Sequence, residues 1–242
     1  MTPLTRLTMA LEAELELAKD PQMEADLAAK YLERVNETAQ RRDATLKSLV
    51  VFDGLLAIAA SGRNITVPGI NISMADIPAI LEGLIGITSA SVYIFSFSFT
   101  TWLCYSQIHF VFSKRIAARH NLDPDLISFA QTASEPTLKM FRSKLNIWGE
   151  DWHRSGNAFS GMVAAYSISN NIFFIMAPLL HLSLMYYAAS RMIKLQDFDF
   201  IHIVFYAWVV LAHVLAIFTW VVPSVPFSFQ MDVESSQSQP GA

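Results

Sequence analysis

Long stretches without a charged residue divide this chain and indicate helices that cross a membrane. No Asp, Glu, Lys or Arg occurs in 83–113, 155–190 or 200–231. Each stretch exceeds the roughly 20 apolar residues that a helix needs to cross a hydrocarbon core about 30 Å thick. The pattern predicts an all-α integral membrane protein whose helices form a bundle in the lipid bilayer.

A shorter apolar segment at 46–62 either crosses the membrane or only enters it. It is short for a span, and it contains Asp53. Basic residues precede it, and they recur after the next apolar stretch, between 106 and 157. Basic loops prefer the cytoplasm, and two cytoplasmic regions are separated by an even number of spans. We therefore predict that 46–62 crosses.

The predicted architecture is a four-transmembrane-helix bundle with cytosolic helical extensions and both termini in the cytoplasm. The parts are a cytosolic helical region 1–45, spans near 46–62, 78–105, 170–189 and 200–222, a cytosolic helical loop 106–157, a short external turn from Arg191 to Asp199, and a disordered Ser- and Gln-rich tail 223–242. The first residues do not resemble a signal peptide. Together with the loop charges, this favours a bacterial inner membrane.

The charged N-terminal region shows a helical pattern of its own. Pro21 divides it into two helices, and Asp20 is suited to cap the second. One apolar stripe of this second helix consists of Met23, Leu27, Tyr31 and Val35. The stripe packs either on the protein's own cytosolic helices or against a soluble partner or a neighbouring subunit.

Composition limits the function classes. The chain is 53% hydrophobic and 16% charged with a net charge of −4. It therefore lacks the excess of basic residues that is typical of nucleic-acid-binding proteins. No nucleotide-binding or hydrolase motif is present, and the histidines and the single cysteine match no metal pattern, so we expect neither an enzyme nor a metal site. Small residues in the second span, including Gly83, Gly86 and Ala90, favour close helix packing or a homo-oligomer.

Ionisable residues inside the apolar stretches are the functional candidates, because charge in a bilayer is costly. Asp53, His181 and His213 are expected near the middle of their spans, at similar depth. Glu82 and His202 are expected near the external boundary. Pro178, just before His181, is expected to free backbone carbonyls.

Three functions fit these residues, beside the alternative that the polar groups only pack the bundle. In the first, the protein is a sensor, anchor or effector subunit whose cytosolic helices engage a partner. In the second, it is an oligomeric channel or a proton- or ion-translocating protein that uses the mid-depth groups. In the third, the two histidines ligate haem b axially, which would be the only cofactor.

Overall fold

All regular secondary structure that is described in this chain is helical. The structure is a computed structural model and describes residues 1–17, 20–62, 79–122, 157–195 and 199–226. The elements are α1 (Pro3–Leu17), α2 (Pro21–Ser61), α3 (Ile80–His120), α7 (Asn157–Leu195), α8 (Phe200–Val221) and a 3-10 helix, η2 (Val222–Ser224). Helices α2, α3, α7 and α8 are long and apolar enough to cross a membrane, which confirms the predicted helical class and the four candidate spans.

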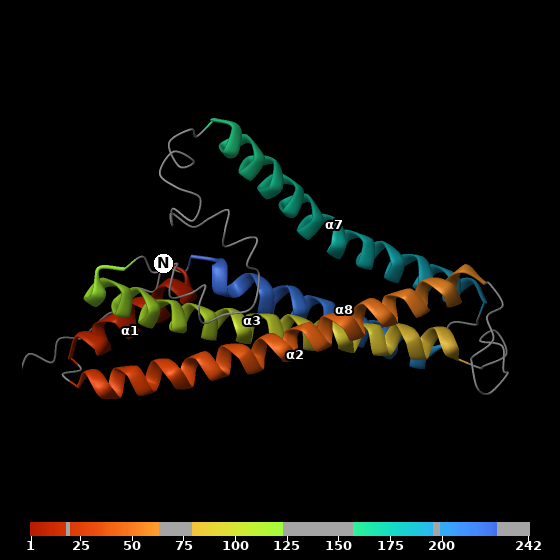
Figure 1. The fold of residues 1–242 in the computed structure, drawn as a ribbon. Helices are drawn as coiled ribbons and strands as arrows, with labels where there is room; N and C mark the ends of the chain where they lie inside the picture. Colours follow the sequence, from red (N-terminus) through yellow and green to blue (C-terminus); the bar gives the residue numbers. More distant parts are fainter. Residues whose placement is uncertain (18–19, 63–78, 123–156, 196–198, 227–242) are drawn as a thin grey trace, which may run out of the picture.

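The two longest helices, α2 and α3, pack against each other as an antiparallel pair (Figure 1). Each helix has 41 residues and is therefore roughly 60 Å long. Helix α1 packs on α3 at one end, which we call the α1 end. At the opposite end, which we call the hairpin end, α2 and α7 finish and α3 and α8 begin (Figure 1).

Helix α2 begins as predicted but does not stop at the predicted domain boundary. Asp20 accepts a hydrogen bond of 2.9 Å from the backbone N–H of Gln22, and Pro21 occupies the first turn. The helix then continues without a break through residue 45 to Ser61. Because no proline follows Pro21 within this stretch, nothing interrupts the backbone hydrogen bonds. The charged helix and the short apolar segment are one rigid element.

Helix α7 is longer than the apolar span at both ends; a helix starting near Ala158, before the span, is compatible with the uncharged sequence there, but the extension past Ser190 differs from the prediction. It begins at Asn157 and runs to Leu195, so the prediction of a turn starting at Arg191 is wrong. The last turns stay helical because Met192 is buried in the core and the Arg191 guanidinium donates to the carbonyl of Ala60.

The other predicted boundaries differ less. Helix α3 starts at Ile80 after Ala79, whose φ is 55°, and α8 follows the predicted 200–222 closely. The rest of the expected loop 106–157 beyond residue 122 and the expected tail beyond residue 226 lie outside the described residues.

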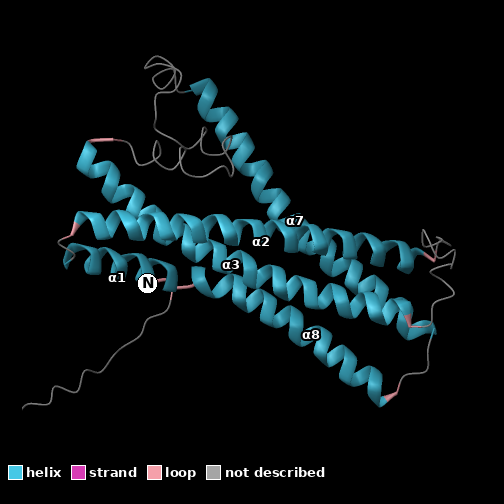
Figure 2. Ribbon diagram, turned by 60° about the horizontal axis from the view of Figure 1, so that its bottom comes forward, coloured by secondary structure: helices cyan, strands magenta, loops and turns pink. Residues whose placement is uncertain are grey.

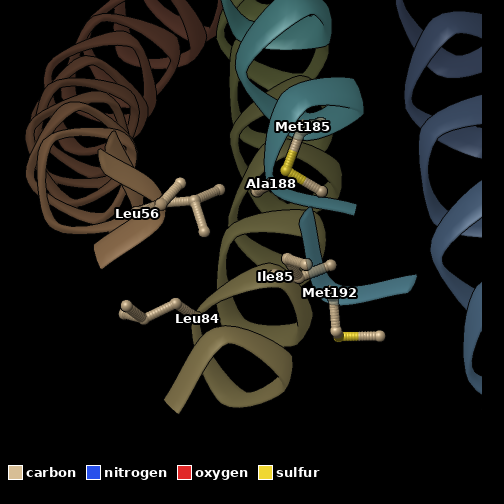
Figure 3. Packing of buried hydrophobic residues seen from close by; sticks show 7 residues of the cluster. Leu56, Leu84, Ile85, Met185, Ala188 and Met192 are labelled. Atoms are coloured by element: carbon tan, nitrogen blue, oxygen red, sulfur yellow. The ribbon is translucent and has the colours of Figure 1, made fainter. Parts of the chain in front are cut away.

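Two apolar clusters hold the helices together. The first lies toward the hairpin end and joins α2, α3 and α7; its buried members are Leu56, Ala60, Leu84, Ile85, Met185, Ala188 and Met192 (Figure 3). The second lies at the α1 end, where Phe112 of α3 is fully buried and the ring of Tyr31 stacks on it at 5.5 Å. Burying a phenylalanine from water contributes about 2–3 kcal/mol.

The first half of α7 departs from the other helices (Figures 1 and 2). The described side chains from Ala165 to Leu180 are all exposed, apart from a half-buried Pro178. Among the side chains of α7 whose burial is described, His181 is the first buried one. The described buried side chains of α7 therefore lie between His181 and Met192.

Candidate functional site: a hydrogen-bonded Asp–His–His chain

Three of the predicted ionisable residues meet in one hydrogen-bonded chain. Asp53 comes from α2, His181 from α7 and His213 from α8. The His181 Nδ1 lies 2.9 Å from Oδ1 and 3.1 Å from Oδ2 of Asp53. The His181 Nε2 lies 3.0 Å from the Nε2 of His213. We call these three residues the triad; it links α2 to α7 and α8, which come much later in the sequence.

Backbone chemistry fixes the far end of this chain. The Nδ1 of His213 lies 2.8 Å from the carbonyl oxygen of Val209, one turn earlier in α8. A carbonyl oxygen only accepts, so this nitrogen carries a proton. In a neutral imidazole the other nitrogen is then an acceptor, which assigns the His213 Nε2 as the acceptor of a proton from His181.

The number of protons in the triad follows from this assignment. Each of its three contacts holds one proton: between Asp53 and His181, between the two histidines, and between His213 and the Val209 carbonyl. Three protons on one carboxyl and two imidazoles give a net charge of zero, either as a carboxylate beside an imidazolium or as a neutral acid beside two neutral imidazoles. A neutral set is the least costly arrangement in an apolar environment.

Any other number of protons breaks the contact between the histidines. With one proton fewer, His181 donates to the Asp53 carboxylate and two nitrogen lone pairs face each other. With one proton more, two N–H groups face each other. At an Nε2–Nε2 distance of 3.0 Å neither arrangement is a hydrogen bond, and both leave a net charge in the bundle. The hydrogen bond between His181 of α7 and His213 of α8 therefore requires one particular proton count.

The triad is well sheltered and lies far from the hairpin end. The side chain of His181 is 8% exposed and that of Asp53 is 25% exposed. Asp53 precedes the end of α2 by roughly 12 Å, and His213 follows the start of α8 by roughly 20 Å. The three residues thus lie at one level of the bundle, and their mid-depth position in a membrane stays a prediction.

The predicted boundary residues lie apart from the triad. Glu82 and His202 occupy the first turns of α3 and α8, both at the hairpin end. The Nδ1 of His202 lies 2.7 Å from Oδ1 of Asp199, which caps α8 by accepting from the His202 backbone N–H. These hydrogen bonds hold the pKa of the Asp199 carboxyl below its ordinary value.

A change at Asp199 tests this cap. A lowered pKa means that the ionised cap stabilises the start of α8 above about pH 4, and that this contribution is lost as the pH falls through the lowered pKa. Hydrogen-exchange protection of the first turn of α8 is expected to fall at acid pH in the wild type and at every pH in Asp199→Ala. Asp199→Ser should retain protection without the pH dependence, since serine caps while uncharged. Equal protection in all three proteins would contradict the assignment.

The small residues of α3 face α8 of the same chain. A Cβ added to Gly86 would lie 3.6 Å from the ring of Phe205, and Ala90 lines an apolar groove with Trp208 and Ala212. Gly83 differs: apart from its chain neighbours and the backbone of α3 itself, no described atom lies within 4 Å of a Cβ built there. Gly86 and Ala90 thus allow close packing of two helices inside one bundle.

The apolar stripe of α2 is covered mainly by the chain itself. Leu27 and Tyr31 pack in the cluster at the α1 end and Val35 is buried, whereas Met23 is 57% exposed. Steps of four residues rotate by about 40° around a helix, so four such positions drift off one face. The buried face at the start of α2 carries Glu24 instead of Met23.

Glu24 is a structural residue that the sequence analysis missed. Its side chain is 2% exposed and forms ion pairs with two arginines of α3, Arg115 at 3.3 Å and Arg119. Arg115 also donates to the carbonyl of Leu15 in α1 at 2.9 Å. We call this the Glu24 clamp, because it ties α1, α2 and α3 together. The sequence signal for this role is the spacing, because Glu24 lies one helical turn before Ala28 on the face of α2 that is buried.

Thr88 of α3 is a buried polar residue without a partner among the described residues. It is fully buried, and its hydroxyl makes no hydrogen bond there. The neighbouring Ser89 is equally buried, but its hydroxyl donates to the carbonyl of Ile85 at 2.7 Å. Leaving a buried hydroxyl unsatisfied costs about 1–3 kcal/mol.

Thr88→Val is therefore expected to raise the free energy of unfolding by about 1 kcal/mol, because it removes the unsatisfied hydroxyl and keeps the branched shape. The measurement is denaturant or thermal unfolding of the purified protein in detergent. Ser89→Ala is the matched control and should be neutral or slightly destabilising, since its hydroxyl is satisfied. Destabilisation by Thr88→Val would show that its hydroxyl has a partner.

The arrangement of the histidines does not fit axial ligation of haem. A metal–imidazole bond is about 2 Å long, so two ligands on opposite faces of a haem hold their nitrogens about 4 Å apart with the macrocycle between them. Here the two Nε2 atoms are 3.0 Å apart and the rings stack at 25°. We therefore derive no chemistry through haem.

No protein-family model, curated protein or solved structure matches this chain.

Proposed function

We propose that this chain is a four-span membrane protein of the sensor or effector class, and that the signal it detects is the proton. The observation that carries the proposal is the triad, whose central contact requires one proton count. In the proposed topology the hairpin end faces outward across a bacterial inner membrane. The α1 end, with both termini, lies in the cytoplasm and presents helices to a soluble partner.

Helix α2 supports the link between signal and output. Asp53 and Glu24 lie on the same unbroken helix, roughly 44 Å apart along its axis. At one end α2 is tied to α7 through the triad, and at the other to α1 and α3 through the Glu24 clamp. When the contact between His181 and His213 opens, α7 loses this contact with α8 and keeps the hydrogen bond from Tyr206 to the carbonyl of Ala189. We expect the resulting shift of α2 to reach the helices at the α1 end.

The surroundings of the triad leave few other charges to set its proton count. On α2, the charged residue preceding Asp53 is Lys47; on α7, the first charge after His181 is Arg191. Helix α3 has no charged residue between Glu82 and Lys114, although Tyr93 lies near this level. On α8, the hydroxyl of Tyr206 donates to the carbonyl of Ala189 at 3.3 Å. Within the described residues, the ionisable side chains in contact at this level are thus the three members of the triad.

A second candidate function is proton translocation, alone or in a homo-oligomer. The chain of hydrogen bonds through three titratable groups favours it, because protons pass along such chains. The apolar cluster between the triad and the hairpin end opposes it, since its buried side chains fill the space between α2, α3 and α7. We therefore prefer a proton-dependent change of packing over a flux.

The test is a distance measurement across the pH range in which histidine titrates. Spin labels on the exposed residues Val50 of α2 and Ile175 of α7, in a Cys104→Ser background, report the position of α7 in nanodiscs from about pH 5 to about pH 9. We expect the distance distribution to shift at both ends of this range. Unchanged distances would reject the sensor, and proton flux in sealed liposomes carrying the wild type would favour translocation.

A further inference from the structure

The two sides of the triad differ in how they are packed. On the hairpin side, the first apolar cluster fills the space between α2, α3 and α7 (Figure 3). Leu56, Ile85 and Ala188 in it are 0% exposed, and Met192 is 2% exposed. Figure 3 shows Met185, Ala188 and Ile85 close together. A layer of this kind has no room or partners for water.

Interhelical hydrogen bonds of Arg191 and Tyr206 lie beyond this layer, toward the hairpin end. The Arg191 guanidinium of α7 donates to the carbonyl of Ala60 and lies against Gly62, which ends α2. On the other side of α7, the Tyr206 hydroxyl of α8 donates to the carbonyl of Ala189. These contacts hold α2, α7 and α8 together between the triad and the hairpin end.

On the side toward the α1 end, Leu49 of α2 and Ala216 of α8 are buried, but the described side chains of α7 form no such layer. Among the described side chains of α7, His181 is the first buried one, and those that precede it are exposed except for half-buried Pro178. Both ribbon views show α7 leaving the bundle in this direction (Figures 1 and 2). On α2, exposed Lys47 and Ser48 lie roughly 9 Å and 8 Å from Asp53 along the helix axis. Polar, exposed groups therefore come within two turns of the triad on this side.

We infer that the triad exchanges protons only with the compartment at the α1 end and is closed to the opposite one. This inference rests on the proposed function for its meaning, because it names the compartment whose pH is read. The sensing residues and the α1–α3 output helices then face the same compartment. The protein reports the pH of the side on which its output acts.

The first arm of the test uses thiol accessibility, which does not depend on any titration of the triad. In a Cys104→Ser background, Ala177→Cys and Ala188→Cys place matched thiols on α7, one turn before and two turns after His181. A membrane-impermeant thiol reagent is added to either side of proteoliposomes of known orientation. Thiols react as thiolates, which form only where water reaches them.

We expect Ala177→Cys to react on the order of tenfold faster from the α1 side than from the other side, and Ala188→Cys to react from neither. Labelling of Ala188→Cys from the hairpin side, or no labelling of Ala177→Cys from the α1 side, would overturn the inference. Because both variants leave the triad intact, folding is checked by an unchanged gel-filtration profile. If Ala188→Cys fails this check, Leu184→Cys, half-buried and nearer the triad, takes its place.

The second arm applies a pH step to one side of the same liposomes and reads the Val50–Ile175 label distance. A response to steps on the α1 side alone is expected. A response to steps on the hairpin side overturns the inference while leaving the proton sensor intact. No response from either side, with the expected labelling pattern, rejects the sensor but retains the one-sided access.

Discussion

Asp53→Asn is expected to remove the alkaline half of the pH response and to leave the bundle intact. The amide of asparagine can donate to the His181 Nδ1, so His181 still donates to His213 and His213 to the Val209 carbonyl. The variant therefore reproduces the neutral three-proton arrangement. It has no carboxyl proton to lose, so raising the pH no longer opens the contact between the histidines.

The acid half of the response should survive in this variant. Adding a proton to His213 still places two N–H groups face to face, whatever residue occupies position 53. The Val50–Ile175 distance in Asp53→Asn is thus expected to stay constant from neutral to alkaline pH and to change only on acidification. An alkaline change equal to that of the wild type would show that Asp53 is not the group that loses the proton.

Asp53→Ala is the contrasting variant. It removes both the charge and the hydrogen-bond partner of the buried His181 Nδ1, which costs about 1–3 kcal/mol. We expect α7 to be loosened at all pH values and the melting temperature in detergent to fall. If alanine and asparagine behave alike, the hydrogen bond at position 53 contributes nothing, and the carboxylate acts only through its charge.

Much of the bundle could be predicted from the sequence because charge is excluded from apolar layers. Runs without charged residues gave the candidate spans, and a fixed rise per residue placed Asp53, His181 and His213 at one level. Depth does not determine rotation about the helix axis. The order of the triad, with His181 in the centre, depends on how α7 and α8 turn toward α2, and the pattern of α7, apolar on all sides, does not specify this.

Other differences have the same origin in side-chain contacts between distant residues. The continuation of α7 past Arg191 depends on a carbonyl of α2 that is 131 positions away in sequence. Local pattern favoured a turn there because charged and polar residues cluster after Ser190. The stripe from Met23 to Val35 consists of three steps of four residues, and each step rotates by about 40° around the helix. The buried face of α2 can be predicted only if this rotation is taken into account.

Glu24→Ala is expected to destabilise the α1 end by about 2–3 kcal/mol. Hydrogen bonds to charged groups contribute about 1.5–3 kcal/mol each, and Glu24 is almost fully buried between two arginines. The loss should stay below the sum of both contacts, because Arg115 and Arg119 are 27% and 43% exposed and can turn to water.

The measurement for this variant is hydrogen exchange over α1 and the first turns of α2, with thermal unfolding in detergent. Protection should fall there and remain unchanged around the triad, since the clamp and the triad are roughly 44 Å apart on α2. Glu37→Gln is the matched control: its ion pair with Arg34, at 2.7 Å, is exposed on both sides and should contribute less than about 1 kcal/mol. If the two variants lose equal stability, burial of Glu24 does not strengthen its contacts, and α1 is held by the apolar cluster around Phe112 instead.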